Sequence, residues 1–168
     1  MITNCPGLLL GIQTADCIPV LVADVANRVV AAFHAGWRGT VQRVVELGVR
    51  RMQLEFGSQP ENLQAAIGPG IGVCCYEVGS EVQAKFGESF EYGAELFRLK
   101  ESPQGPSFHL NLREANRRQL LDAGIRAGAI YMVGGCTSCE PERYFSHRAS
   151  GGNTGRMMAV IGIRPNRD

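Results

Sequence analysis

The sequence lacks any apolar run long enough to cross a bilayer, so we expect no membrane-spanning segment. It also lacks the basic, then apolar, then small-residue order of a signal peptide, which favours a cytoplasmic protein. Without export, the six cysteines are expected to be thiols, ligands or a nucleophile rather than disulfides. Neither sign of charge is in excess, because the net charge is +1, so we expect neither nucleic acid nor a membrane as partner.

Internal repeats, low-complexity tracts and linkers are missing as well. Apolar residues make up 45% and charged residues 20% of the chain, which is the balance of a globular protein. A length of 168 residues suits one domain and is enough to bury a core. We therefore expect residues 1–168 to form a single α/β domain.

Apolar residues follow two different periods along the chain. Short apolar runs predict strands at residues 8–14, 19–24, 28–34, 63–67, 129–133 and 156–163. Helical spacing predicts helices at residues 40–56, 80–86 and 112–123. Thr40 and Asn111 are the expected N-caps, and residues 88–107 are expected to be an irregular loop or an exposed excursion. Together these elements predict a mixed sheet with helices packed on it.

The segment Thr14-Ala15-Asp16-Cys17-Ile18-Pro19 places a cysteine where a strand pauses before a proline. Side chains at strand ends reach into clefts from a rigid support, which favours a functional role. A free cysteine is also commonly a small buried apolar residue. This segment alone leaves both interpretations open.

The segment His34-Ala35-Gly36-Trp37-Arg38-Gly39-Thr40 lies between a predicted strand and a predicted helix. Its glycines permit a tight turn, and the start of the helix offers free N–H groups to an anion. Arg38 adds a planar guanidinium suited to phosphate or carboxylate. Trp37, the only tryptophan, could stack on a base or cover the core. A lone histidine is commonly a hydrogen-bonded core residue, but this cluster favours a site.

Cys17 and His34 end two neighbouring predicted strands joined by a turn. Hairpin pairing would bring both residues to one edge of the sheet. A thiolate and an imidazole suit zinc or copper, and they equally suit a cysteine–histidine nucleophile pair. Two ligands are fewer than the three that a catalytic zinc needs.

Other cysteines and histidines are weaker candidates. Cys74 and Cys75 are not expected to hold one metal, because adjacent side chains diverge. Cys136 and Cys139 have the spacing of a redox motif but lack its flanking βαβ pattern. His109 is expected to lie at the surface or to cap a helix.

Four ordered segments carry a resemblance to a known family: Thr-Ala-Asp-Cys-Ile-Pro-Val, His-Ala-Gly-Trp-Arg-Gly, Ile-Gly-Pro with Cys-Cys-Tyr-Glu-Val, and Thr-Gly-Arg-Met. Over residues 3–163 the chain resembles the laccase-domain purine nucleoside phosphorylases, formerly known as multicopper polyphenol oxidases. The resemblance implies an α/β fold similar to that of cysteine hydrolases. It also implies a zinc site for phosphorolysis of adenosine, inosine and methylthioadenosine and for deamination of adenosine.

The resemblance places two zinc ligands on Cys17 and His34. The family's third ligand is a histidine in an upstream Gln-Val-His-Gly segment that this sequence does not contain. The chain is therefore expected to be an N-terminally truncated domain. The expected site is completed by a catalytic Arg38 and by the substrate-binding residues Asp16, Trp37 and Arg148, with Arg38 and Arg148 as candidates to hold the phosphate.

Three other functions remain open, and the sequence does not indicate an oligomeric state. Relatives are linked to copper and phenol oxidation, although three histidines are too few to ligate a multicopper cluster. A metal-free cysteine–histidine hydrolase would use Cys17 on an amide, for example in editing peptidoglycan precursors. A non-enzymatic fragment would serve as a binding module.

Overall fold

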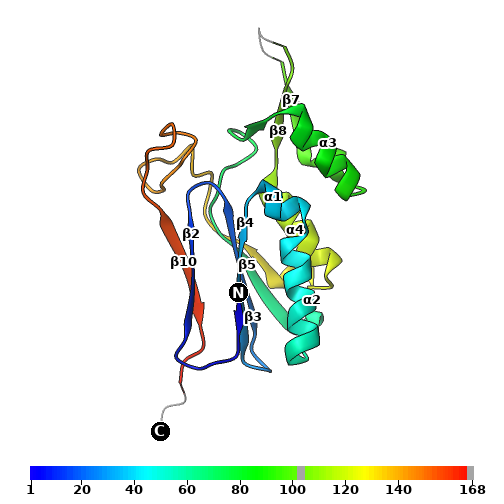
Figure 1. The fold of residues 1–168 in the computed structure, drawn as a ribbon, viewed down its shortest axis with the longest axis vertical. Helices are drawn as coiled ribbons and strands as arrows, with labels where there is room; N and C mark the ends of the chain where they lie inside the picture. Colours follow the sequence, from blue (N-terminus) through cyan, green and yellow to red (C-terminus); the bar gives the residue numbers. More distant parts are fainter. Residues whose placement is uncertain (102–104, 166–168) are drawn as a thin grey trace.

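The protein is described by a computed structural model that covers residues 1–101 and 105–165. Figure 1 shows a two-stranded sheet on the left, a five-stranded sheet in the middle and helices on the right. The central sheet has the order β1 (Ile2–Thr3), β4 (Val29–Ala35), β3 (Ile18–Asp24), β5 (Leu63–Ile67) and β9 (Ile130–Met132). Its strands pair antiparallel except that β9 joins β5 in parallel, which confirms the predicted mixed sheet.

Helices cover one face of the central sheet (Figure 1). Helix α2 (Val44–Phe56) packs on β4, and α4 (Leu112–Asp122) packs on α2 and β5, so the predicted covering is confirmed. The Asn111 side chain accepts the N–H of Glu114 at 3.1 Å, as expected of a helix cap. The described residues also form three short 3-10 helices: η1 (Pro60–Asn62), η2 (Gly93–Leu96) and η3 (Ala127–Ala129). No helix in the described part of the chain has both the length and the apolar character needed to span a membrane.

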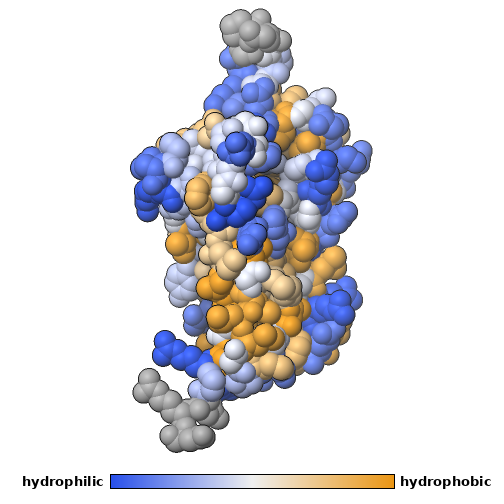
Figure 2. Space-filling view, turned by 60° about the vertical axis from the view of Figure 1, so that its left-hand side comes forward, coloured by the Kyte–Doolittle hydropathy of each residue, from blue (hydrophilic) through white to orange (hydrophobic). Residues whose placement is uncertain are grey.

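Strands β2 (Leu9–Thr14) and β10 (Met157–Gly162) form an antiparallel ribbon on the opposite face of the central sheet. Residues of β2 are alternately exposed and buried, and the inward-facing ones pack against β4 in a second core. This core consists of Leu10, Ile12, Val30 and Ala32. Figure 2 shows apolar surface on this side of the molecule, and the ribbon exposes Leu9, Met158 and Val160.

A third sheet, with the order β6 (Glu77–Val78), β8 (Ser107–Leu110) and β7 (Phe97–Lys100), lies beside α3 (Ser80–Ser89). The prediction of an irregular segment over residues 88–107 is therefore wrong where η2, β7 and the start of β8 form, and residues 102–104 lie outside the described part. Phe97 pairs with Leu110, and Leu99 pairs with Phe108. Strands β7 and β8 have only four residues each, so their apolar patterns are too short to be recognised without their partners.

The predicted helix over residues 40–56 is two helices. Helix α1 (Trp37–Val41) ends early, and Arg43 adopts a left-handed φ of 57° before α2 begins. Thr40 is not a cap, because its hydroxyl donates to the Gly36 carbonyl at 3.0 Å within α1. The expected single capped helix is therefore wrong.

Helix α4 fixes the end of α1 through two buried amide side chains. Asn116 Nδ2 donates to Thr40 Oγ1 at 3.1 Å, and Gln119 Nε2 donates to the Thr40 carbonyl at 2.7 Å. The N–H of Arg43 donates to the same carbonyl at 2.9 Å. These bonds take up the carbonyl that would otherwise continue a regular helix, which explains the break.

Candidate metal and substrate site

Several connecting segments meet at the end of the central sheet where β3 begins and β4 ends. The N–H of Ile71, after β5, donates to the Asp16 carbonyl at 2.9 Å. The N–H of Thr137, after β9, donates to the Gly70 carbonyl at 3.1 Å, next to a parallel bridge between Gly70 and Cys136. Segments far apart in the sequence therefore converge around Asp16 and Cys17.

At this end of the sheet, Cys17 directly precedes β3 and His34 lies in β4. Pro19 pairs directly with His34 and Ile18 with Ala35, so extending this register by one residue makes Cys17 a diagonal neighbour of His34. Diagonal partners in an antiparallel pair lie roughly 7–8 Å apart, within reach of long side chains. Alternation along β4 places His34 on the same face as Ala32, the face covered by the β2–β10 ribbon.

The Cys17 thiol occupies a half-buried position beside the β4–α1 connection. Burial raises the pKa of this thiol, and the Asp16 carboxylate raises it further. A Cβ atom at Gly36 would lie 2.9 Å from the Cys17 sulfur, so a glycine at this position leaves room for the thiol. A cation bound at the sulfur would offset both effects, because it favours the thiolate.

Neither of the other two histidines joins this pair. In the described part of the chain, Cys17 and His34 have no third histidine, cysteine, aspartate or glutamate close enough to share a metal ion. His109 is 6% exposed, and its Nδ1 lies 3.1 Å from the Val73 carbonyl, so the expected surface or capping role is wrong. His147 lies beside Gly152 in a separate turn.

Asp16 connects the β2–β3 turn to the loop after β9. It is 8% exposed and adopts a left-handed φ of 85°. Its Oδ1 accepts the Thr137 hydroxyl at 2.6 Å, and its Oδ2 accepts the N–H of Arg148 at 2.7 Å. Both oxygens therefore hold the loop in place, and the expected contact of Asp16 with substrate stays a prediction.

Trp37 and Arg38 line a hollow on α1. The Arg38 guanidinium lies over the Trp37 ring, 4.4 Å from its centroid. Both residues border a cavity of about 380 Å³, together with Val41, Gln42 and Lys85. None of the described ion pairs joins Arg38 to Asp16. Because α1 has only five residues, attraction for an anion at this hollow depends on the two cationic side chains rather than on a helix dipole.

Tyr76 lies beside the predicted site residues and was not predicted from the sequence. Burial raises its pKa to about 12, and the nearby charges of Cys17, Arg148, Asp16 and Arg38 make smaller contributions. Tyr76 therefore lies among the predicted site residues and is neutral near pH 7. The Arg148 guanidinium lies 5.4 Å from the centroid of the Tyr76 ring. The only signal in the sequence was the Cys-Cys-Tyr-Glu-Val motif that contains Tyr76.

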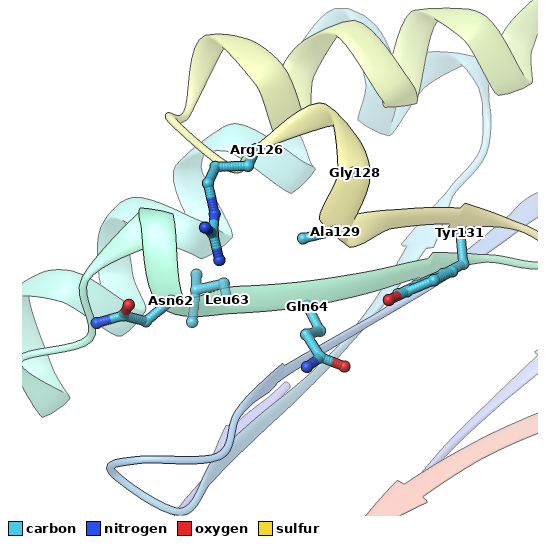
Figure 3. A pocket seen from close by; sticks show the side chains of 7 residues that line it. All are labelled: Asn62, Leu63, Gln64, Arg126, Gly128, Ala129 and Tyr131. Atoms are coloured by element: carbon cyan, nitrogen blue, oxygen red, sulfur yellow. The ribbon is translucent and has the colours of Figure 1, made fainter.

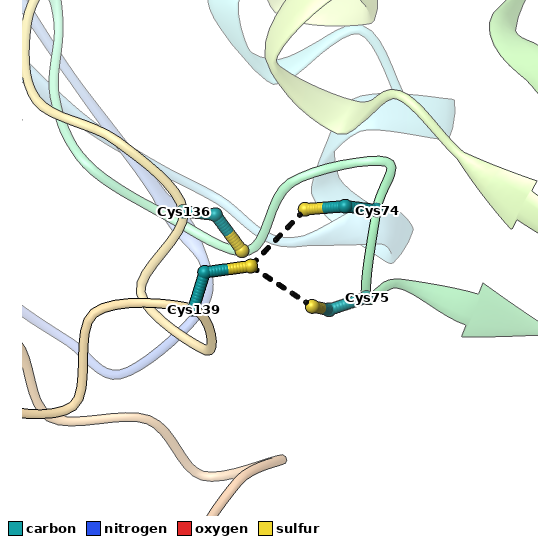
Figure 4. Close-up of side chains that lie close together, drawn as sticks. All are labelled: Cys74, Cys75, Cys136 and Cys139. Carbon is teal, nitrogen blue, oxygen red and sulfur yellow. Dashed lines mark hydrogen bonds between the residues drawn. The ribbon is translucent and has the colours of Figure 1, made fainter.

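Four cysteines come together in two neighbouring loops, one after β5 and one after β9 (Figure 4). The sulfur atoms of Cys74, Cys75, Cys136 and Cys139 all lie within 4.8 Å of one another, so this cluster could bind a metal ion. The Cys139 sulfur is 3.5 Å from that of Cys74 and 3.3 Å from that of Cys75. The expectation that the adjacent cysteines diverge is wrong, because they occupy a tight turn where both side chains face the second loop.

Another cavity lies elsewhere. Its volume is about 410 Å³, and it is lined by Asn62, Leu63, Gln64, Arg126, Gly128, Ala129 and Tyr131 (Figure 3). Leu63 pairs with Asp24, at the opposite end of β3 from Cys17. This cavity has no metal-ligating side chain, and we assign it no function.

Comparison with known proteins places these features in a family. A profile described as multi-copper polyphenol oxidoreductase laccase matches residues 1–164. A purine nucleoside phosphorylase of Bacteroides thetaiotaomicron is 40% identical over 164 residues, which cover 97% of this chain and 60% of the relative. The adenosine deaminase RL5 from an unidentified prokaryote is 38% identical over 162 residues, covering 96% of this chain and 60% of the relative.

Solved structures agree with the sequence relatives. The crystal structure of the hypothetical protein YfiH from Bacillus licheniformis matches with a TM-score of 0.90 at 38% identity, covering 97% of this chain and 60% of that chain. This chain thus spans about 60% of the length of the relatives it matches. The profile match over nearly all residues and this shared fold show that the chain belongs to the multi-copper polyphenol oxidoreductase laccase family.

Proposed function

We propose that the protein is a zinc-dependent purine nucleoside phosphorylase that cleaves adenosine, inosine and methylthioadenosine with phosphate and also deaminates adenosine. The observation that carries the proposal is the β3–β4 register, in which Cys17 directly precedes β3 at the end of the sheet where His34 lies in β4. The names of two relatives, a purine nucleoside phosphorylase and an adenosine deaminase, support this substrate class.

Cys17 and His34 offer a thiolate and an imidazole, both of which are zinc ligands. A catalytic zinc has three protein ligands and one open position, so the proposed site needs a third ligand besides Cys17 and His34. In the family that the sequence resembles, that ligand is a histidine in a Gln-Val-His-Gly segment, which this sequence does not contain. When bound, the zinc would supply a Lewis acid and an activated water for deamination.

The remaining roles follow from the hollow on α1. The Trp37 ring offers a flat surface for a purine, and Arg38 and Lys85 supply positive charge for phosphate beside it. The Arg148 guanidinium already has a partner, because it donates to the Glu77 carbonyl at 3.0 Å. We therefore propose Arg38 as the principal phosphate-binding residue. Arg148 is proposed as a second one, which must break its bond to Glu77 to bind phosphate.

Incubation of the whole protein with inosine and phosphate tests the proposal, and release of hypoxanthine is the expected result. The Cys17→Ser variant should lose both this activity and its zinc at that site. Cys5→Ser is the matched control, since Cys5 is exposed and lies outside both cysteine groups. Zinc-loaded protein that releases no hypoxanthine would contradict the proposal.

Two alternative activities give different results. A copper-dependent polyphenol oxidase, as the family's description suggests, would bind copper in preference to zinc and oxidise phenols. A cysteine–histidine amide hydrolase would be inactivated by alkylation of Cys17 and would be indifferent to chelators. Metal analysis without added copper and a chelator series separate both from the proposed enzyme.

A further inference from the structure

Four cysteines outside the Cys17 site are brought together by the fold. Cys74 and Cys75 lie in the turn after β5, and Cys136 and Cys139 lie in the loop after β9. Cys75 and Cys139 are 64 residues apart in the sequence, yet their sulfur atoms are 3.3 Å apart (Figure 4). All four sulfur atoms point into one small volume at the surface.

The sulfur positions fit one tetrahedral metal ion. Zinc–thiolate bonds of about 2.3 Å place four sulfur atoms about 3.8 Å from one another. The sulfur of Cys139 lies 3.3 Å from that of Cys75 and 3.5 Å from that of Cys74, and no pair exceeds 4.8 Å. Both of these sulfur–sulfur distances lie within about 0.5 Å of the tetrahedral edge. A disulfide would need about 2.05 Å, well below both of these sulfur–sulfur distances.

Backbone hydrogen bonds form both halves of the cluster before any ion binds. The N–H groups of Cys75 and Tyr76 donate to the Gly72 carbonyl at 3.0 and 2.9 Å. In the other loop, the N–H of Cys139 donates to the Cys136 carbonyl at 3.1 Å. Cys-x-x-Cys turns of this kind supply two ligands in structural zinc sites. The cluster therefore needs little reorganisation to close around an ion.

One sulfur already accepts a backbone hydrogen bond. The N–H of Gly72 donates to the Cys136 sulfur at 3.1 Å. Hydrogen bonds to the sulfur atoms are a common second layer around structural metal ions.

Cations near both loops offset the negative charge of a thiolate cluster. Lys100 Nζ donates to the Cys74 carbonyl at 2.8 Å. The Arg113 guanidinium donates to the carbonyls of Val133 and Gly134, both at 3.0 Å, just ahead of Cys136. Two positive charges thus flank a site that would carry two negative charges when filled.

We propose that Cys74, Cys75, Cys136 and Cys139 bind a structural zinc ion. Binding of Zn²⁺ forms four zinc–sulfur bonds and releases the four thiol protons to solvent, which leaves a net charge of −2. Four thiolates fill the tetrahedral positions and leave none for water or substrate, so the ion is not catalytic. The exposed Cys74 and Cys139 give the ion a path of entry.

The ion cross-links the two loops that hold Asp16. One loop donates the N–H of Ile71 to the Asp16 carbonyl, and the other donates the Thr137 hydroxyl to its carboxylate. Zinc at the cysteine cluster therefore fixes the position of the turn that carries Cys17 without touching that residue. This inference does not depend on the proposed enzyme activity.

Metal analysis of the whole protein, purified under reducing conditions, tests the proposal. The Cys136→Ser/Cys139→Ser variant is expected to lose about one equivalent of zinc relative to the parent. Cys5→Ser should lose none, and Cys17→Ser/His34→Ala should keep the cluster's equivalent. The last variant separates this test from the proposed function. Unchanged zinc content in the cluster variant would overturn the proposal.

A second measurement keeps the cysteine cluster intact, so it does not depend on cluster variants that fail to fold without the ion. Metal-free Cys17→Ser/His34→Ala protein, with its cluster intact, is titrated with Co²⁺. We expect the absorption bands of tetrahedral cobalt with four thiolates, which one equivalent of Zn²⁺ abolishes. An octahedral spectrum, bound iron in the protein as purified, or a disulfide within the cluster found by mass spectrometry would refute a zinc site.

Discussion

Substitutions of Asp16 distinguish what its hydrogen bonds contribute to stability from what its negative charge contributes. In an Asp16→Asn variant, the amide oxygen can accept the N–H of Arg148, and the amide N–H can donate to the Thr137 hydroxyl, which can accept as well as donate. Asparagine also tolerates the left-handed φ of 85° at this position. We expect the stability of Asp16→Asn to lie within about 1 kcal/mol of the parent.

An Asp16→Ala variant loses both acceptors. The N–H of Arg148 is then left without a partner in a partly buried loop, which costs about 1–3 kcal/mol. Alanine at a positive φ adds roughly 1 kcal/mol. A total near 3 kcal/mol corresponds to a melting temperature lower by roughly 6–12 °C for a protein of this size.

Thermal denaturation of the two variants beside the parent measures the difference. Asp122→Asn is the control for loss of a carboxylate, because Asp122 accepts only the exposed hydroxyl of Tyr92 at 2.8 Å among the described bonds. Equal destabilisation of Asp16→Asn and Asp16→Ala would refute the reasoning, because charge would then matter and hydrogen bonds would not. Phosphorolysis that is lost in a stable Asp16→Asn protein would support the predicted contact with substrate.

Three further outcomes follow from packing and charge. Gly48→Ala should destabilise the protein by about 1–2 kcal/mol, because a Cβ at this position would overlap the Phe33 ring. Gly87→Ala should stabilise the protein by about 0.5–1 kcal/mol, because a Cβ at Gly87 has open space around it. Urea denaturation of both variants tests this pair. Arg38→Lys should raise the KM for phosphate with unchanged zinc content and folding, and equal phosphate dependence would remove Arg38 from phosphate binding. Burial raises the pKa of Asp24, but hydrogen bonds outweigh it and lower that pKa, so its contribution to stability is present above about pH 4 and is lost as the pH falls through the lowered value. Denaturation curves between about pH 2 and pH 5 should then fall less steeply for Asp24→Asn than for the parent.

Local patterns in the sequence were enough to predict most regular elements and the family. The Leu63–Ile67 strand has the predicted bounds, and Asn111 caps the helix that begins at Leu112. Such features depend on residues within one or two turns of each other, so periodicity and capping chemistry reveal them. The ordered motifs around Cys17 and His34 identified the family because four of them occur together.

Long-range contacts decided the rest. Gln119 ends α1 by bonding the carbonyl of Thr40, 79 residues away, and no local signal near Thr40 predicts that break. Tyr76 joins the site only because the turn after β5 folds against the loops around Asp16.

The cysteine cluster shows the same limit most clearly. From the sequence, Cys74 and Cys75 are adjacent residues and Cys139 belongs to a distant pair, so neither group alone could surround a metal ion. Parallel pairing of β9 with β5 places the two following loops side by side, and the four sulfur atoms meet there. The sequence by itself therefore determined which side chains were available as ligands. The pairing of strands that are distant in sequence determined which of them share a site, because only tertiary packing sets distances between separate segments.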